Sequence, residues 1–472
     1  MAEIAAETLV AVFDEAPLNR RYWITFALLS SGASLDLFDF FIVGYLVAQL
    51  GPQWHLTYGE SSVILLAGGV GGIVSGLCWG ALSDALGRKR QIAFGYLICA
   101  IGAGGIALIP SGAWQLFALL RFAVGFGLAA ASVPALTMVT EITPTRVRTL
   151  ITSLWVASTS IGILAAPALG ATLYTVLGWR KVAALGVTPA AIAPLVLILV
   201  PESVRWLVAK GRFAEARRLV ARQLDLPLEA APLPTVRPVN PPRASLAELW
   251  SKPRLVWLVF LTMGGAATVD YAVILWGPTI ISLLLKTTVQ EAARYFVLVV
   301  LCGMVGKVFF SILPHYVGRR RAGQLHGFGL AAGIALAGYF HSVFIGSFPL
   351  FVLLLMGTNV FMQGGFTNLA PYNIEVFGVR LGARAAGLNQ ASNGVGKVLG
   401  PSLLGLIAGS GGVLTPHATE NAILPAFLVL SLCALAIGFA FTFLGPETHG
   451  KPLILEEEEE ATAVPAPALP GL

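Results

Sequence analysis

Charged side chains are scarce in this sequence of 472 residues. Only 11% of its residues are Asp, Glu, Lys or Arg, whereas 56% are hydrophobic. Soluble domains carry roughly 25% charged residues, so the composition excludes an ordinary soluble globular protein. It instead indicates a chain that lies largely within a membrane.

The sequence also lacks the motifs of nucleotide-driven and metal-dependent proteins. It has no G-x-x-x-x-G-K-[ST] loop, which argues against direct use of ATP. Its six histidines are scattered without metal-ligand spacing, and no catalytic constellation appears, so we expect neither an enzyme nor a cofactor other than coupling protons. The four cysteines form no C-x-x-C pair and are interpreted as small packing residues: Cys78, Cys99, Cys302 and Cys433.

Long apolar runs, in contrast, are abundant. A helix needs roughly 20 apolar residues to cross a bilayer, and the 52 glycines allow such helices to pack closely. Twelve candidate spans can be counted, at 22–50, 60–83, 91–109, 113–139, 149–173, 181–200, 254–284, 293–314, 323–341, 347–373, 385–409 and 422–445. The sequence therefore predicts an all-α membrane protein with twelve transmembrane helices.

Two copies of one pattern divide the chain into halves. Residues 80–90 read G-A-L-S-D-A-L-G-R-K-R, and 231 residues later 311–321 read S-I-L-P-H-Y-V-G-R-R-R. Each half also ends alike, with Pro-Glu-Ser at 201–203 and Pro-Glu-Thr at 446–448. Parallel repeats are one architecture of secondary transporters, so we expect two pseudo-symmetric six-helix bundles.

The expected parts are an N-terminal segment, a first bundle, a linker, a second bundle and a tail, at 1–21, 22–200, 201–252, 253–445 and 446–472. Basic residues gather in alternate loops and not on one soluble face, which argues against nucleic acid as a partner. The positive-inside rule then places both termini, the linker and the tail in the cytoplasm. The acidic first 21 residues lack the apolar core of a cleavable signal peptide. We expect a monomer embedded in the lipid bilayer of a cell membrane, such as a bacterial inner membrane.

Six ionisable side chains fall at bilayer depth: Asp36, Asp39, Arg121, Asp270, Lys307 and Lys397. A charge within lipid is costly, so each is a functional-site hypothesis. Asp36 and Asp39 are three residues apart and share one helix face. Two nearby carboxylates in a desolvated place can bind and release a proton, which predicts proton coupling. The alternative is a static pair of charges that holds two helices together.

The two lysines are predicted to lie deep in the second half. Lys307 precedes Gly318 by eleven residues, and Lys397 follows Arg384 by thirteen. At ~1.5 Å per residue these positions lie about 16 and 20 Å from the helix ends. Two ammonium groups in a low-dielectric cavity attract an anion strongly. The alternative is that each lysine only neutralises an aspartate, such as Asp270.

Polar side chains accompany these lysines. Asn389 and Asn393 lie on the same helical stripe as Lys397, and a polar stripe facing lipid would be costly. We expect the polar side chains to face a central cavity. The further candidate substrate-binding residues are Asp270, Tyr271, Asn359 and Gln363.

Charges at the cytoplasmic helix ends form a third group, with Asp84, Arg88, Glu141, Arg148, Arg319, Glu375 and Arg384 as members. Ion pairs between them can latch helix ends together, which predicts a gate. For the arginines, the alternative is that they only set topology. His315 replaces Asp84 in the second copy, so that latch should be weaker or pH-dependent.

Four motifs make the chain resemble the major facilitator superfamily of transporters. Residues 80–89 match G-x-L-x-D-x-x-G-R-R except for Lys89, and Arg121 to Gly127 is similar to the R-x-x-x-G-x-G of the fourth helix. Residues 201–207 are similar to the P-E-S-P-R-W-L of sugar porters, and 446–450 to their P-E-T-K-G. The resemblance implies the major facilitator fold, with ion pairs at the cytoplasmic ends holding an outward-open state.

The resemblance also implies roles for the buried charges. Sugar–proton symporters of the superfamily place an Asp of helix 1 against an Arg of helix 4, which correspond here to Asp39 and Arg121. The pair within 36–39 is similar to the D-G-x-D of aromatic-acid–proton symporters, with Leu37 in place of Gly. Carboxylate carriers use cations of helices 8 and 11, where Lys307 and Lys397 fall.

These observations predict a secondary active transporter that imports a small organic anion, a carboxylate or an aromatic acid, together with protons by alternating access. A sugar or polyol–proton symporter is the first alternative, favoured by the P-E-S and P-E-T motifs. A phosphate–proton symporter is another, since phosphate carriers pair aspartates of helices 1 and 7 with a lysine of helix 11.

Overall fold

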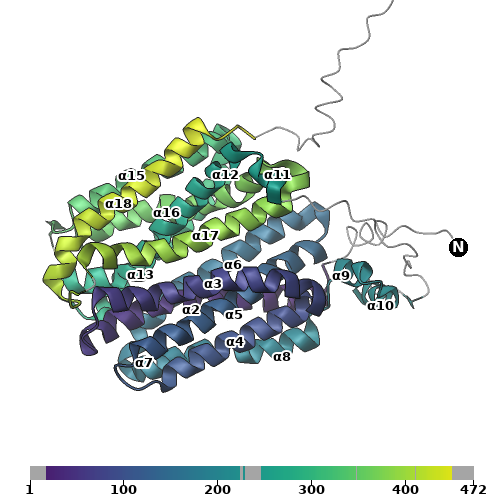
Figure 1. Cartoon of the computed structure of the whole chain (residues 1–472), viewed down its shortest axis with the longest axis horizontal. Helices are drawn as coiled ribbons and strands as arrows, with labels where there is room; N and C mark the ends of the chain where they lie inside the picture. The colour runs from purple at the N-terminus through teal and green to yellow at the C-terminus, as the bar shows by residue number, and fades with distance from the viewer. Residues whose placement is uncertain (1–17, 224–226, 229–245, 347, 410, 449–472) are drawn as a thin grey trace, which may run out of the picture. The chain divides into compact units, whose positions relative to one another are not determined.

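The computed structural model describes residues 18–223, 227–228, 246–346, 348–409 and 411–448. The first half contains α2 (Arg20–Gln53), α3 (Tyr58–Leu86), α4 (Arg88–Leu108), α5 (Trp114–Ile142), α6 (Thr145–Thr172), α7 (Tyr174–Ala184), η1 (Leu185–Val187) and α8 (Pro189–Leu199). Because α7, η1 and α8 follow one another without a loop, they form a single broken passage through the bundle (Figure 1). The first half therefore has six helical passages.

The second half repeats this order. It contains α12 (Pro253–Val259), η3 (Phe260–Gly264), α13 (Gly265–Leu284), α14 (Val289–Val317), α15 (Arg319–Tyr339), α16 (Leu350–Glu375), α17 (Gly378–Ala408) and α18 (Pro416–Phe443). A short hairpin of β1 (Phe344–Ile345) and β2 (Phe348–Pro349) precedes α16. With α12, η3 and α13 as one passage, the expected twelve helical spans are confirmed.

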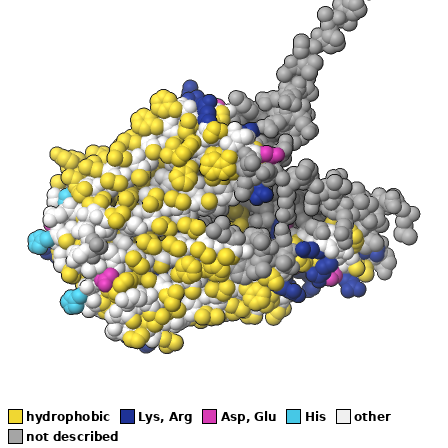
Figure 2. Space-filling view, in the orientation of Figure 1, with side chains coloured by type: hydrophobic (Ala, Val, Ile, Leu, Met, Phe, Trp, Pro, Cys, Tyr) yellow, Lys and Arg dark blue, Asp and Glu magenta, His cyan; other side chains and the backbone are white. Residues whose placement is uncertain are grey.

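Nine of these passages, within the described residues, are long and apolar enough on their own to cross a membrane. The other three are α6, α15 and α17. In α6 the apolar stretch is shorter, at Leu154–Leu169. In α15 and α17 arginines, asparagines and Lys397 lower the hydropathy. Figure 2 shows hydrophobic side chains spread over the visible helices, which is the surface that lipid requires.

Single glycines separate the second and third passages of each half. Gly87 lies between α3 and α4 with φ of 87°, and Gly318 lies between α14 and α15 with φ of 85°. Positive φ is readily adopted only by glycine, so these two positions explain the Gly in both copies of the repeated pattern. The chain reverses there within one residue, and the following arginines begin the next helix.

By internal contacts, the structure divides into two compact units. Unit 1 comprises Met1–Pro241, Ala272–Val300 and Lys397–Ala422, and unit 2 comprises Pro242–Tyr271, Leu301–Gly396 and Ile423–Leu472. Unit 1 therefore joins the first half to segments of α13, α14, α17 and α18. Tyr58 illustrates this packing, since its hydroxyl donates to the Thr415 carbonyl oxygen over 3.1 Å.

The helices of unit 1 approach one another through small residues. A Cβ on Gly125 of α5 would lie 1.9 Å from the carbonyl oxygen of Gly68 in α3. No side chain fits in that space, so the two backbones touch where the sequence has glycine on both helices. This is the close packing that membrane helices use in place of a hydrophobic driving force.

Short helices occupy the linker expected at 201–252. They are α9 (Val204–Ala209), α10 (Phe213–Gln223) and α11 (Leu246–Trp250). Ser203 begins α9 by accepting a hydrogen bond from the Trp206 amide over 3.2 Å. Buried Val204, Leu207 and Val220 pack α9 against α10, so these two helices form a small core of their own.

Candidate functional site

A buried ion pair lies in the interior of unit 1. Arg121 of α5 donates from Nη1 to Asp39 Oδ2 of α2 over 3.0 Å, and the two side chains are 2% and 6% exposed. The same guanidinium donates to the main-chain oxygens of Asp39 and Phe40 over 3.2 and 3.4 Å. The pairing predicted for Asp39 and Arg121 is therefore present, and so little water reaches it that any change of its charge must be compensated.

Glycines make room for this pair. A Cβ on Gly68 would lie 3.2 Å from Nη2 of Arg121, and a Cβ on Gly186 of η1 would lie 2.4 Å from Oδ1 of Asp39. The carboxylate and the guanidinium thus rest directly on helix backbone. Nε of Arg121 is buried and makes no hydrogen bond to any described residue.

The aromatic ring of Phe40 connects this pair to a second cation. The Arg121 guanidinium carbon lies 5.9 Å from the ring centre, and Nζ of Lys397 lies 4.9 Å from it. Lys397 reaches this place because α17 crosses α3 at Gly69, where a Cβ would lie 2.9 Å from Cβ of Lys397. Attraction between a cation and an aromatic ring is worth roughly 0.5–2 kcal/mol.

A second polar cluster lies in unit 2. Nε2 of Gln363 in α16 donates to Oδ1 of Asp270 in α13 over 2.5 Å, and both residues are buried. The charge of Asp270 also attracts that of Lys307 in α14. The structure thus brings together three of the predicted substrate-binding residues, and it places Lys307 beside the aspartate that the alternative interpretation named.

The remaining predicted polar residues lie around this cluster or on α17. Asn359 is buried, and its amide faces Gly303 of α14 at the place where a Cβ would lie 2.5 Å away. Oδ1 of Asn389 accepts from the Asn373 amide over 2.8 Å, while Asn393 contacts the sulfur of Met263 at 3.8 Å. Tyr271 is buried, next to Asp270.

The charges predicted at the helix ends form a network in the first half. Arg88, at the start of α4, pairs with Glu141 at the end of α5. Glu141 also accepts from the Ser203 hydroxyl over 2.6 Å. Glu202 accepts from the main-chain amides of Arg88 and Lys89 over 3.1 and 3.3 Å, so it caps the start of α4 with a negative charge.

The second half repeats the network contact by contact. Arg319 pairs with Glu375 over 2.7 Å, Glu375 accepts from the Thr448 hydroxyl over 3.1 Å, and Glu447 accepts from the amides of Arg319 and Arg320 over 2.9 and 3.2 Å. Each of these ion pairs joins helices of the same half. A gate that depends on them stays a prediction, and these two pairs by themselves fasten each half internally.

The remaining predicted residues are Asp36, Asp84, Arg148 and Arg384. The side chains of Asp36, Asp84 and Arg148 lie outside the described residues. Arg384 is half-buried at the start of α17. His315, which takes the place of Asp84 in the second copy, is exposed.

Sequence reasoning missed two parts of these sites. Phe40 adjoins Asp39 in the sequence, but a single phenylalanine in an apolar helix gives no signal that two cations lie over its ring. In the sequence, Glu202 and Glu447 stand out only as members of the repeated Pro-Glu-Ser and Pro-Glu-Thr motifs. Their repetition directly before Ser and Thr was the signal that could have identified them as helix caps.

The fold and the buried charges define a membrane transporter built from two like halves. Residues 26–459 match the family described as sugar (and other) transporter, and the chain belongs to this family, within the major facilitator superfamily. Its members are transporters and not enzymes, as the sequence predicted.

Individual relatives agree with this assignment. The niacin transporter NiaP of Acinetobacter baylyi is 27% identical over 94% of this chain and 98% of its own length. The gallate transporter of Pseudomonas putida is 28% identical over 57% of this chain and 60% of its own length. The partially occluded, inward-open structure of the xylose transporter XylE from E. coli superposes with a TM-score of 0.69 at 15% identity, covering 92% of this chain and 100% of that one, which shows the shared fold.

Proposed function

We propose that this protein imports a small aromatic carboxylate together with protons. The observation that carries the proposal is the arrangement of Asp39, Arg121 and Lys397 around the Phe40 ring. It combines a carboxylate that can take up a proton, a buried guanidinium bound to it, and a second cation that shares an aromatic neighbour.

Charge balance links the proton to the anion. With Asp39 ionised, the three charged groups carry a net charge of +1, and protonation of Asp39 raises it to +2. An unbalanced charge in a buried place is costly, so protonation favours entry of a carboxylate. Release of the carboxylate in turn favours loss of the proton. Binding of each partner thus promotes binding of the other, as symport requires.

The side chains present suit a carboxylate on an aromatic ring. Lys397 offers an ammonium group, and Nε of Arg121 is a buried donor that has no acceptor among the described residues. A carboxylate oxygen is the acceptor that both donors bind most strongly. Niacin and gallate, the substrates named for two relatives, are each a carboxylate on an aromatic ring.

The cluster in unit 2 has a different role in the proposal. Asp270 and Lys307 carry opposite charges, so together they attract an anion less than Lys397 does. We propose that Gln363 and Asn359 bind polar substituents of the ring. A neutral sugar would leave the added charge of a protonated Asp39 unbalanced, which makes the sugar alternative weaker.

In the proposal, the protein lies in the cell membrane with both termini in the cytoplasm. The two halves expose the site alternately to the two sides of the membrane. A thermal-shift screen with nicotinate, gallate, phosphate and xylose tests the substrate class, because a ligand that binds the folded state stabilises it by RT ln(1 + [L]/Kd) and so raises the melting temperature. Stabilisation by an aromatic carboxylate that is lost in Lys397→Gln supports the proposal. Stabilisation by xylose or phosphate alone contradicts it.

A further inference from the structure

A cavity of about 400 Å³ opens at the start of α2, away from the buried charges described above. Its walls are the first turn of α2, the first turn of α4, the end of α8 and one face of α10. All of them belong to unit 1. Its charged lining consists of Arg21, Lys89, Arg218, Arg222, Glu202 and Glu215.

The cavity is positively charged even after its acidic residues are counted. Four basic and two acidic side chains leave a net charge of +2 in the lining. Both acids also have other partners, since Glu202 caps α4 and Glu215 accepts a hydrogen bond from Arg212, the residue that precedes α10. The charge of Glu202 attracts that of Lys89, whereas the charges of Arg90 and Arg222 repel it. An anion in the cavity would relieve this repulsion.

Hydrogen bonds hold α10 in place above the cavity. Arg21 donates from Nη1 to the carbonyl oxygen of Arg222, and Asn19 donates to that of Gln223 over 2.8 Å. The last carbonyls of α10 therefore bind the residues that begin α2. This fixes Arg218 and Arg222, one helical turn apart on α10, on the side that lines the cavity.

One wall of the cavity is apolar and continues onto the outer surface. Ile24, Ile198 and Leu199 line the cavity and are also 37%, 73% and 49% exposed. Trp23, which directly precedes Ile24 in α2, is 42% exposed, and aromatic rings of this kind favour the boundary between lipid and water. The cavity thus has a basic side and a lipid-facing side, an arrangement that suits an amphipathic ligand.

We propose that this cavity binds the headgroup of an anionic phospholipid. The phosphodiester lies among Lys89, Arg218 and Arg222, and the acyl chains leave along Ile24 and Ile198. The volume accommodates a glycerophosphate headgroup, whereas a free phosphate would use none of the apolar wall. A bound lipid fastens α10 to the start of α2 and so links the linker helix to the membrane.

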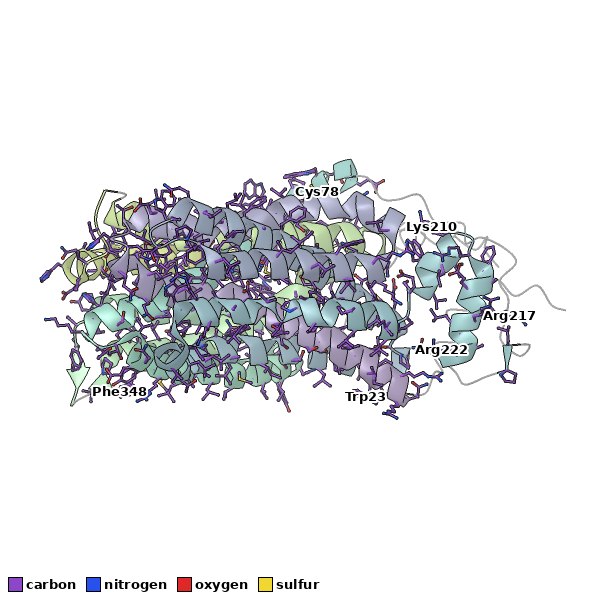
Figure 3. The ribbon with its side chains drawn as sticks, turned by 90° about the horizontal axis from the view of Figure 1, so that it is seen from below. Trp23, Cys78, Lys210, Arg217, Arg222 and Phe348 are labelled. Atoms are coloured by element: carbon purple, nitrogen blue, oxygen red, sulfur yellow. The ribbon has the colours of Figure 1, made fainter. Side chains whose placement is uncertain are left out.

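Lys210 and Arg217 provide a matched control on the same segment, and their positions are labelled in Figure 3. Arg222 is labelled near the end of α2 that carries Trp23, and Lys210 and Arg217 are labelled farther from it. Neither Lys210 nor Arg217 lines the cavity. In Figure 2 basic side chains gather where α9 and α10 lie, so a control must remove the same charge from the same surface. The test pair is R218Q/R222Q, and the control pair is K210Q/R217Q.

The experiment measures binding of phosphatidylglycerol to the purified full chain by native mass spectrometry, with phosphatidylcholine as the neutral comparison. Each basic side chain near an anionic lipid is worth roughly a factor of five, so R218Q/R222Q should lower the affinity about 25-fold and K210Q/R217Q much less. Circular dichroism confirms that both variants are folded. Free glycerol 1-phosphate and inorganic phosphate are tested as competitors at millimolar concentration.

Three results would overturn the proposal. Equal loss in the test and control pairs would show unspecific attraction to the basic surface. Unchanged phosphatidylglycerol binding in R218Q/R222Q would show that the lipid does not bind in the cavity. Complete competition by either soluble phosphate would show a site for a soluble anion and not for a lipid.

Discussion

Nζ of Lys397 lies 4.9 Å from the centre of the Phe40 ring, over which the Arg121 guanidinium also lies. Lys397 belongs to the second half of the sequence and Phe40 to the first, so residues far apart in the chain meet at one aromatic side chain. Asp39 directly precedes Phe40 in the chain, and its carboxylate binds Arg121. A change of charge on Asp39 therefore alters the electrostatic environment of both Arg121 and Lys397.

Replacing Asp39 with Asn should abolish proton-driven accumulation but preserve exchange of the anion across the membrane. The amide cannot release a proton, and because it is neutral like a protonated Asp39, the three-residue site keeps the net charge of +2 that favours the anion. Counterflow in proteoliposomes measures exchange, and uptake under an inward proton gradient measures accumulation.

The matched control for this experiment is Glu291→Gln, which removes an exposed carboxylate at the start of α14. It should leave both activities unchanged. Accumulation at the normal level in Asp39→Asn would show that another group carries the proton.

Replacing Lys397 with Gln should raise KM for the anion about 10- to 100-fold, since a hydrogen bond to a charged group contributes roughly 1.5–3 kcal/mol. The exposed Lys181→Gln is the control and should leave KM unchanged. Lys307→Gln should have a smaller effect on KM than Lys397→Gln, because Asp270 already balances its charge. A larger rise in KM for Lys307→Gln than for Lys397→Gln would place the anion-binding site in unit 2.

Exchanging Gly125 for Ala should destabilise the protein, because the new Cβ would lie 1.9 Å from the Gly68 carbonyl oxygen. Gly357 in α16 provides the contrast, since a Cβ added there would meet no described atom within 4 Å apart from its chain neighbours and the backbone of its own helix. Gly357→Ala should stabilise its helix by up to about 1 kcal/mol. Melting temperatures in detergent compare the two, and equal values would contradict the close approach of α3 and α5.

Glu202→Gln and Glu447→Gln should lower stability by similar amounts, each about 1 kcal/mol, because each removes a negative charge that caps a helix. Glu215→Gln is the control, since its pair with Arg212 is exposed and contributes little. Thermal unfolding of the three variants measures this. A large effect at only one of the two caps would show that the repeated contacts are not equivalent.

A disulfide between Thr57→Cys and Val413→Cys should stop transport until it is reduced. These residues face each other across an isolated antiparallel bridge within unit 1, where directly opposed residues are close enough for a cross-link. If the contact opens during each cycle, as alternating access requires, oxidation blocks uptake and a reductant restores it. Single-cysteine variants control for the four native cysteines. Full uptake by the oxidised double variant would show that this contact stays closed.

The order of the helices could be predicted from the sequence because it depends on apolar length and on a repeated glycine turn. Gly87 and Gly318 are visible in the pattern, and their positive φ explains why. The pair of Asp39 and Arg121 could be predicted from the resemblance to sugar–proton symporters, because the buried charges by themselves allow several pairings. Phe40 could not, because its role comes from the crossing of α3 and α17 at Gly69. The partners of Lys307 and Lys397 likewise depend on how the helices rotate, which hydropathy does not determine.

Uptake of labelled nicotinate and gallate into proteoliposomes, with and without an inward proton gradient, tests the central claim most directly. The account predicts that the gradient drives accumulation of an aromatic carboxylate above its external concentration, with protons entering alongside it, and that Asp39→Asn loses this accumulation. Accumulation that needs no proton gradient, or a gradient that drives xylose and no organic acid, would contradict it.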